Sequence, residues 1–153
     1  MNALLGDLMS FYARLDEFMR DSDRDCGICG ECCQKLYQLR VYPVELENIR
    51  RHVADDLAIK KFQNFANSPV VKIWGDISGQ CPFQDGALCV IYPLRPYHCR
   101  VYGHYDYQGR SLLERCVYRG YAIAYYHREE LPLIDELDHL VESYESKNNL
   151  PVG

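Results

Sequence analysis

The residues of this 153-residue chain best suited to chemistry are eight cysteines, four of which lie close together. Cys26, Cys29 and Cys32 are each separated by two residues, and Cys33 follows directly. A C-x-x-C loop beside glycine lets two sulfurs point inward while backbone N–H groups turn toward the thiolates, which suits zinc and iron alike. Single buried cysteines often pack as small hydrophobic residues, but four within eight residues favour a metal site.

The other four cysteines, Cys81, Cys89, Cys99 and Cys116, are dispersed, with seven, nine and sixteen residues between successive members. Zinc ribbons usually pair two C-x-x-C turns, whereas three local cysteines plus a distant one are common in iron–sulfur proteins. The pattern therefore favours an iron–sulfur cluster, such as a 4Fe-4S cubane, over zinc. Eight thiols allow two tetrathiolate sites, or one site with spare thiols, and the spacing leaves both open.

Positive charge near the dispersed cysteines is the second indication of a metal centre. A centre held by four thiolates carries about two negative charges, which must be offset if it is partly buried. From Tyr92 to Arg119 there are five arginines and two acidic residues, a local charge of +3 in a chain of net charge −5. Arg95 and Arg100 bracket Cys99, so we expect them to donate to its sulfur. The alternative is that they are ordinary surface arginines.

These motifs together resemble the YkgJ-like cysteine-cluster family, whose CxxCxxCC domain is described as zinc- or iron-chelating. The resemblance rests on CGICGECC, residues 26–33, and on CPFQDGALCVIYPLRPYHCRVY, residues 81–102. These segments match the family's C-x-x-C-x-x-C-C signature and its C-P-F, C-x-I-Y and R-P-x-x-C-R elements. The resemblance implies metal ligation by seven cysteines, with Arg95 and Arg100 as motif companions: Cys26, Cys29, Cys32, Cys33, Cys81, Cys89 and Cys99. Cys116 lies outside the matched part.

Other candidate chemistry is weaker. His98 and His104 lie near Cys99 and could replace a thiolate as metal ligands, although eight thiols are available. Nine of the thirteen tyrosines fall between Tyr92 and Tyr126, which predicts an aromatic wall that shields a cluster, lines a groove or simply packs in the core. The sequence has no phosphate-binding glycine loop, dinucleotide fingerprint or Ser–His–Asp arrangement.

Composition narrows the partners and the compartment. The net charge of −5 gives no broad electrostatic reason for binding nucleic acid or an anionic membrane. No apolar run approaches the roughly 18 residues that span a bilayer, and the first residues lack the basic start of a secretory signal. We therefore expect a cytoplasmic location, where closely spaced cysteines more often hold metal than form disulfides. A secreted chain would instead allow 105 disulfide pairings.

Hydrophobic periodicity predicts the elements that position these residues. Apolar side chains at helical spacing indicate a first helix over residues 4–19, a second that begins at Pro43 and continues through Leu57, and a last one opened by Pro132. Ser111 and Glu114 form a capping box for a third helix over residues 112–129. Short strands are expected in residues 36–42 and 70–74, and an irregular loop region in residues 75–109.

The sequence thus predicts a mainly α fold with minor β content, one domain over residues 1–153. Three to four helices would surround a cysteine-ligated metal centre, with a motif core at 26–102 and a helical part at 111–146. The expected function is to hold an iron–sulfur cluster, or zinc, for electron transfer or redox chemistry with a protein partner. Two alternatives remain: a structural zinc module that presents a tyrosine-rich surface, and a protein-modifying enzyme related to the much longer flagellin lysine methylases, which carry this type of cluster.

Overall fold

The computed structural model describes residues 1–19, 40–66, 81–85, 88–109 and 122–149. These residues are mainly helical with few strands, which confirms the predicted class, and they contain five α-helices where three to four were expected. In chain order the elements are α1 (Asn2–Phe18), α3 (Pro43–His52), α4 (Asp56–Ala66), β1 (Gln84–Asp85), β2 (Leu88–Cys89), α5 (Tyr97–Val101), β3 (Tyr105–Tyr107), β4 (Ile123–Tyr125) and α6 (Ile134–Lys147). Two 3-10 turns lie at Tyr92–Leu94 and Arg128–Glu130.

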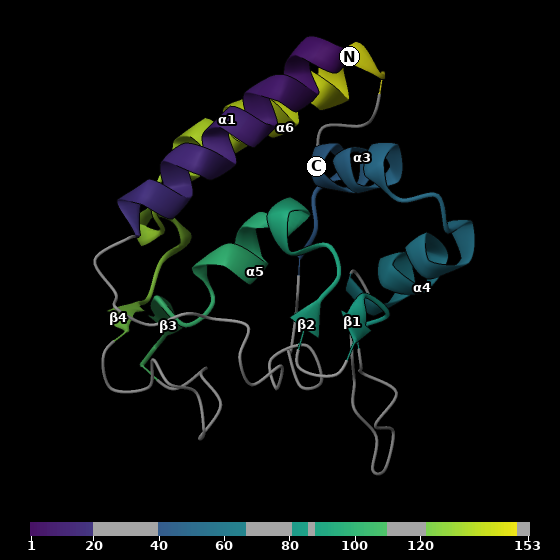
Figure 1. Cartoon of the computed structure of the whole chain (residues 1–153). Coiled ribbons are helices and arrows are strands. Elements are labelled where there is room, and N and C mark those ends of the chain that lie inside the picture. Colours follow the sequence, from purple (N-terminus) through teal and green to yellow (C-terminus); the bar gives the residue numbers. More distant parts are fainter. Residues whose placement is uncertain (20–39, 67–80, 86–87, 110–121, 150–153) are drawn as a thin grey trace.

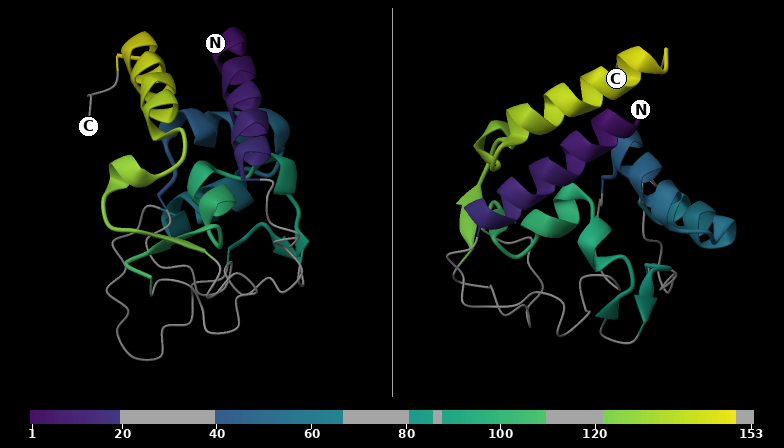
Figure 2. Two further views of the ribbon diagram at one scale, coloured as in Figure 1. Left: turned by 90° about the vertical axis from the view of Figure 1, so that its left-hand side faces the viewer. Right: turned by 45° about the horizontal axis from the view of Figure 1, so that its top comes forward.

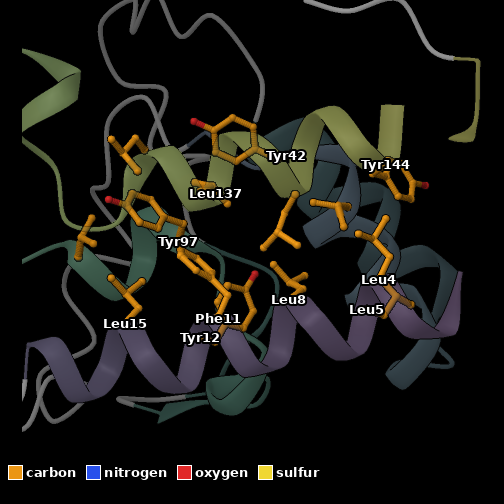
Figure 3. Close-up of a cluster of buried hydrophobic side chains, with 14 of the residues drawn as sticks. Leu4, Leu5, Leu8, Phe11, Tyr12, Leu15, Tyr42, Tyr97, Leu137 and Tyr144 are labelled. Atoms are coloured by element: carbon orange, nitrogen blue, oxygen red, sulfur yellow. The ribbon is translucent and has the colours of Figure 1, made fainter. Parts of the chain in front are cut away.

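The two long terminal helices, α1 and α6, pack side by side in opposite directions, and α5 lies between them and the two small sheets (Figures 1 and 2). Both helices were predicted, because their apolar residues recur every three or four positions and form one buried face. On α1 that face consists of Leu4, Leu5, Leu8, Phe11, Tyr12 and Leu15. On α6 it consists of Ile134, Leu137, Leu140 and Tyr144. Figure 3 shows the labelled side chains of the two faces, among them Leu8 and Leu137, directed toward one another, with Tyr97 of α5 between the two helices.

The predicted second helix is wrong in its length, because the chain forms two helices there. Pro43 opens α3 as expected, but Val53 adopts an extended conformation and the helix ends before it. Oδ1 of Asp55 then accepts hydrogen bonds from the backbone N–H groups of Leu57 and Ala58, both at 3.0 Å, and so caps a new helix, α4. The apolar spacing continues across this break, which is why periodicity alone joined the two helices.

The predicted third helix is wrong over its described part. Residues 123–125 form β4, which pairs in parallel with β3, and a 3-10 turn follows at residues 128–130. The β-branched and aromatic residues of this stretch favour a strand once a partner strand is present. The N-terminal part of the predicted helix, residues 112–121, lies outside the described residues.

The remaining local predictions have mixed outcomes. The irregular region is confirmed for the described residues between 81 and 109, where no element exceeds five residues. Val41 and Tyr42 lead into α3 and belong to no strand, so the strand predicted for residues 36–42 is wrong at its described end. Residues 36–39 and the strand predicted for residues 70–74 lie outside the described residues.

Buried apolar side chains form two clusters, with α3 and α5 between them. The first cluster joins α1, α6, Tyr42, Val44, Tyr97, Val101 and Leu131. The second cluster lies on the other side and consists of Val41, Leu46, Ile49, Ile59, Phe62, Cys81, Phe83 and Ile91. Val44 faces the first cluster while Leu46 and Ile49 face the second, so α3 is covered on two faces. Likewise, α5 contributes Tyr97 and Val101 to the first cluster and Cys99 to the second. The predicted arrangement of helices around a metal centre stays a prediction.

The buried carboxyl group of Glu45 connects three helices, α1, α3 and α5. Its Oε1 accepts hydrogen bonds from the hydroxyl of Tyr12 on α1, at 2.9 Å, and from the backbone N–H of Tyr97 on α5, at 2.7 Å. Its Oε2 accepts from the backbone N–H of Tyr42, at 3.1 Å, just before α3 begins. Glu45 is fully buried, and this burial raises its pKa to about 7.

Replacing Glu45 should therefore destabilise the whole domain. Glu45→Ala removes the acceptor for three donors, two of them from other helices, and leaves buried polar groups without a partner. We expect the free energy of unfolding, measured by urea denaturation, to fall by about 3 kcal/mol. Glu47→Ala, two residues along the same helix, removes only a partly exposed pair with Arg51 and should cost less than about 1 kcal/mol. Equal losses in the two variants would contradict this role.

Candidate metal centre

Three of the predicted ligands, Cys81, Cys89 and Cys99, meet at the second hydrophobic cluster. They come from different elements: Cys81 precedes β1, Cys89 ends β2, and Cys99 lies in α5. Cys81 is buried within the cluster, and the half-buried Cys89 and Cys99 pack against it. The short β1–β2 hairpin pairs Gln84 with Cys89, which returns the chain toward Cys81. The fold thus places in one cluster cysteines that are 8 and 18 positions from Cys81 in sequence.

The other five predicted ligands, Cys26, Cys29, Cys32, Cys33 and Cys116, lie outside the described residues. In the part of the chain that the structure describes, no three His, Cys, Asp or Glu side chains are close enough to hold a metal ion. Cys81, Cys89 and Cys99 therefore share one cluster but do not form a complete site by themselves. Ligation by a set that includes residues 26–33 stays a prediction.

The surroundings of Cys89 show what these sulfurs are suited to. Burial raises the pKa of the Cys89 thiol, whereas a hydrogen bond from the backbone N–H of Ile91 and the positive charge of Arg95 both lower it. Burial is the largest of these effects, so the pKa of Cys89 lies above its ordinary value. The N–H donor and the nearby cation partly offset burial and favour the thiolate, which is the form that binds metal. Cysteine sulfur is also the donor preferred by zinc and by iron–sulfur clusters. The donor set of this cluster therefore fits a thiolate-bound metal.

Arg95, one of the two expected companions, has its charge close to Cys89. Its Nε donates to the carbonyl of Tyr92 at 3.0 Å, and its guanidinium carbon lies 3.6 Å from the centre of the Tyr92 ring. Burial lowers the pKa of His104, and the charge of Arg95 lowers it further. Arg95 is thus held in place by Tyr92, and donation from Arg95 to Cys99 stays a prediction.

Arg100, the second companion, clamps the end of α1 onto the segment that carries Cys99. Its buried guanidinium donates through Nη1 to Asp16 of α1 at 2.6 Å, through Nε to the carbonyl of Arg95 at 2.7 Å, and through Nη2 to the carbonyl of Pro93. It also lies 4.1 Å from the centre of the Tyr12 ring. This positioning role was not predicted, and donation from Arg100 to the Cys99 sulfur stays a prediction.

Histidine and tyrosine side chains near α5 belong mainly to the first cluster. Nε2 of His98 lies 3.4 Å from the Tyr42 hydroxyl, and its ring packs against Tyr42 and Tyr97. Burial lowers the pKa of His98 to about 4, so its imidazole is neutral at physiological pH. Tyr105 and Tyr125 from β3 and β4 also pack against the first cluster. Core packing therefore explains this part of the predicted aromatic wall.

Sequence reasoning missed Glu45, which fixes the N-terminal end of α5. The signal was present, because Glu45 follows Pro43 at the third position of a helix, where a glutamate often bonds back to the N-cap backbone. This local pattern does not predict the hydrogen bond from Tyr97, which lies 52 residues further along the chain. That bond places the first turn of α5, which includes Cys99.

Comparison with known proteins agrees with this donor set. A family described as "CxxCxxCC: Putative zinc- or iron-chelating domain" matches residues 25–118. This stretch is more than half of the chain and contains all eight cysteines. The chain belongs to this family. No curated protein and no solved structure matches the chain.

Membership of the zinc- or iron-chelating family supports the recognised motifs and extends them. The matched region ends at residue 118 and so includes Cys116, which lay outside the motifs quoted above. The family description names both zinc and iron and leaves the choice of metal to experiment. Among the described helices, none has the length and apolar character needed to cross a membrane.

The clamp formed by Arg100 can be tested against an exposed pair. Arg100→Ala leaves two backbone carbonyls and the half-exposed Asp16 carboxylate without their donor, so we expect the free energy of unfolding to fall by about 2 kcal/mol. Arg14→Ala is the matched control, because Arg14 also joins α1 to another element, through Glu136 at 2.7 Å, but both side chains are about half exposed. That variant should cost less than about 1 kcal/mol. A loss for Arg100→Ala no larger than the control would rule out the clamp.

Proposed function

We propose that the chain holds an iron–sulfur cluster through cysteine thiolates and transfers electrons to or from a protein partner. The observation that carries this proposal is the meeting of Cys81, Cys89 and Cys99 at one apolar cluster, in a chain of the zinc- or iron-chelating family. Cys26, Cys29, Cys32, Cys33 and Cys116 are the remaining candidate ligands. Iron is favoured over zinc because the second group of cysteines is dispersed rather than paired in C-x-x-C turns.

The second cluster supplies features that control the reduction potential of such a centre. Potentials depend on burial, on hydrogen bonds to sulfur and on nearby charge. Phe83 and Ile91 provide apolar cover, the N–H of Ile91 bonds to sulfur, and Arg95 supplies positive charge. Because an electron carrier needs a donor or an acceptor, a protein partner is part of the proposal.

A structural zinc module is the second candidate, and exposed side chains near the β3–β4 sheet favour it. Tyr107, Ile123 and Tyr126 are 46%, 60% and 58% exposed. Aromatic and aliphatic side chains of this kind are common at protein–protein contacts. In this alternative the metal stabilises the fold while this surface contacts another protein.

Analysis of protein purified without oxygen separates the two candidates. For the iron–sulfur proposal we expect a brown protein that contains iron and acid-labile sulfide and absorbs broadly near about 400 nm. A colourless protein with stoichiometric zinc would support the structural module instead. A folded protein with neither metal would contradict both.

Substitution of the described cysteines tests the ligand set. Cys81→Ser, Cys89→Ser and Cys99→Ser should each reduce the metal bound per chain and lower the free energy of unfolding by several kcal/mol, because metal binding and folding are coupled. Since all eight cysteines are candidate ligands, the control is His139→Ser, an exposed position on α6, which should retain the full metal content. Unchanged metal content in all three cysteine variants would remove these residues from the ligand set.

A further inference from the structure

Glu45 is an ionisable group that the proposed metal site does not use, and its environment is unusual for a carboxylate. It is fully buried, and its three hydrogen bonds come from neutral donors: the Tyr12 hydroxyl and the N–H groups of Tyr42 and Tyr97. The cation that acts on it electrostatically is Arg100, whose guanidinium is bonded to Asp16 and to two carbonyls. A buried carboxylate without a directly bonded cation is costly in its charged form.

This cost places the ionisation of Glu45 within the physiological range. Burial raises its pKa, while the three hydrogen bonds and the charge of Arg100 lower it, and the resulting value is about 7. Burial raises the pKa values of the Tyr12 and Tyr97 phenols above their usual range, so both phenols stay neutral. Glu45 therefore changes its charge near neutral pH, whereas the two phenols that face it do not.

Two contacts connect Glu45 to the ligand segment. Oε1 accepts from the N–H of Tyr97, the first residue of α5, and Cys99 follows two residues later in the same turn. The same oxygen accepts from Tyr12, which lies close enough to Cys99 for a negative charge on that sulfur to raise the Tyr12 pKa. A change of charge at Cys99 thus acts on the group that is hydrogen-bonded to Glu45.

We propose that Glu45 is the proton acceptor of the metal centre, binding a proton when the centre becomes more negative and releasing it when the centre becomes less negative. This inference rests on the proposed ligation by Cys99. The proton comes from water and returns to water, and no bond to the metal forms or breaks. The Tyr12 hydroxyl can change from donor to acceptor as Glu45 gains the proton.

The direction of the coupling follows from electrostatics. Added negative charge at Cys99 disfavours a second negative charge on Glu45, so it raises the pH at which Glu45 ionises. A unit charge placed nearby in a protein interior shifts an ionisation by on the order of one pH unit. An electron added to an iron–sulfur centre would in this way be accompanied by partial uptake of a proton by Glu45.

Infrared difference spectroscopy of the metal-loaded protein measures this proton directly, through the C=O stretch of a protonated carboxylic acid. The spectrum is titrated with pH in two charge states of the centre. For an iron–sulfur protein these are the oxidised and the dithionite-reduced states, and for a single-ion site they are the Zn²⁺ and Ga³⁺ forms. We expect the acid band to disappear with rising pH at a midpoint higher, by on the order of one pH unit, in the more negative state.

Two variants assign the band. Glu45→Gln should abolish it, whereas Glu47→Gln, on the same helix, should leave it unchanged. If Glu45→Gln does not fold, Tyr12→Phe serves instead, because loss of a hydrogen bond to the charged carboxylate should raise the midpoint in both states. The same midpoint in the two charge states, or a band that neither variant alters, would overturn the coupling while leaving metal binding intact. Absence of metal from the purified protein would instead overturn the proposed function.

Discussion

The hydrogen bonds of one buried carboxyl group, that of Glu45, connect three of the helices to one another. The group holds α1 through the Tyr12 hydroxyl, the start of α3 through the Tyr42 N–H, and the start of α5 through the Tyr97 N–H. Because α5 has only five residues, it has few internal hydrogen bonds to define its own position. Its placement therefore depends on contacts with other elements. At its first residue, Tyr97, these are the backbone hydrogen bond to Glu45 and the hydroxyl hydrogen bond to the carbonyl of Pro132.

The consequence of this placement is that α5 separates two different environments. Tyr97 and Val101 face the large cluster between α1 and α6, whereas Cys99 faces the smaller cluster that also contains Cys81 and contacts Cys89. Arg100 fixes the same helix to α1 through Asp16. A short helix held at both ends in this way can present a sulfur at a defined position next to apolar side chains. The larger cluster supplies the stability that this irregular region cannot supply itself.

Sequence patterns were informative where local chemistry decides the structure. The apolar faces of α1 and α6 repeat at helical spacing, and Pro43 marks the start of α3, so these elements could be predicted. The break between α3 and α4 depends on Asp55 capping a new helix, and β4 depends on pairing with β3, which lies 18 residues earlier at Tyr105↔Ile123. The spacing of apolar residues along a short stretch of sequence predicts neither a side-chain cap nor a pairing with a distant strand.

In the candidate site, too, local sequence patterns could be recognised, whereas contacts between distant residues could not be predicted. The cysteine motifs could be recognised from residue type and spacing, and the family match to residues 25–118 agrees with them. The roles of Glu45 and Asp16 could not be predicted, because each depends on a partner 52 or 84 residues away. The position of His98 next to Cys99 suggested a metal ligand. In the structure its ring contacts Tyr42, and burial lowers its pKa so that the imidazole is neutral.

The central claim is that sulfurs from separate parts of the chain surround one metal centre. X-ray absorption at the edge of the bound metal, on protein purified without oxygen, tests this most directly because it reports the atoms in the first coordination shell. We expect a shell of sulfur, at about 2.3 Å if the metal is zinc and with additional iron neighbours if it is a cluster. A shell dominated by oxygen or nitrogen would contradict it.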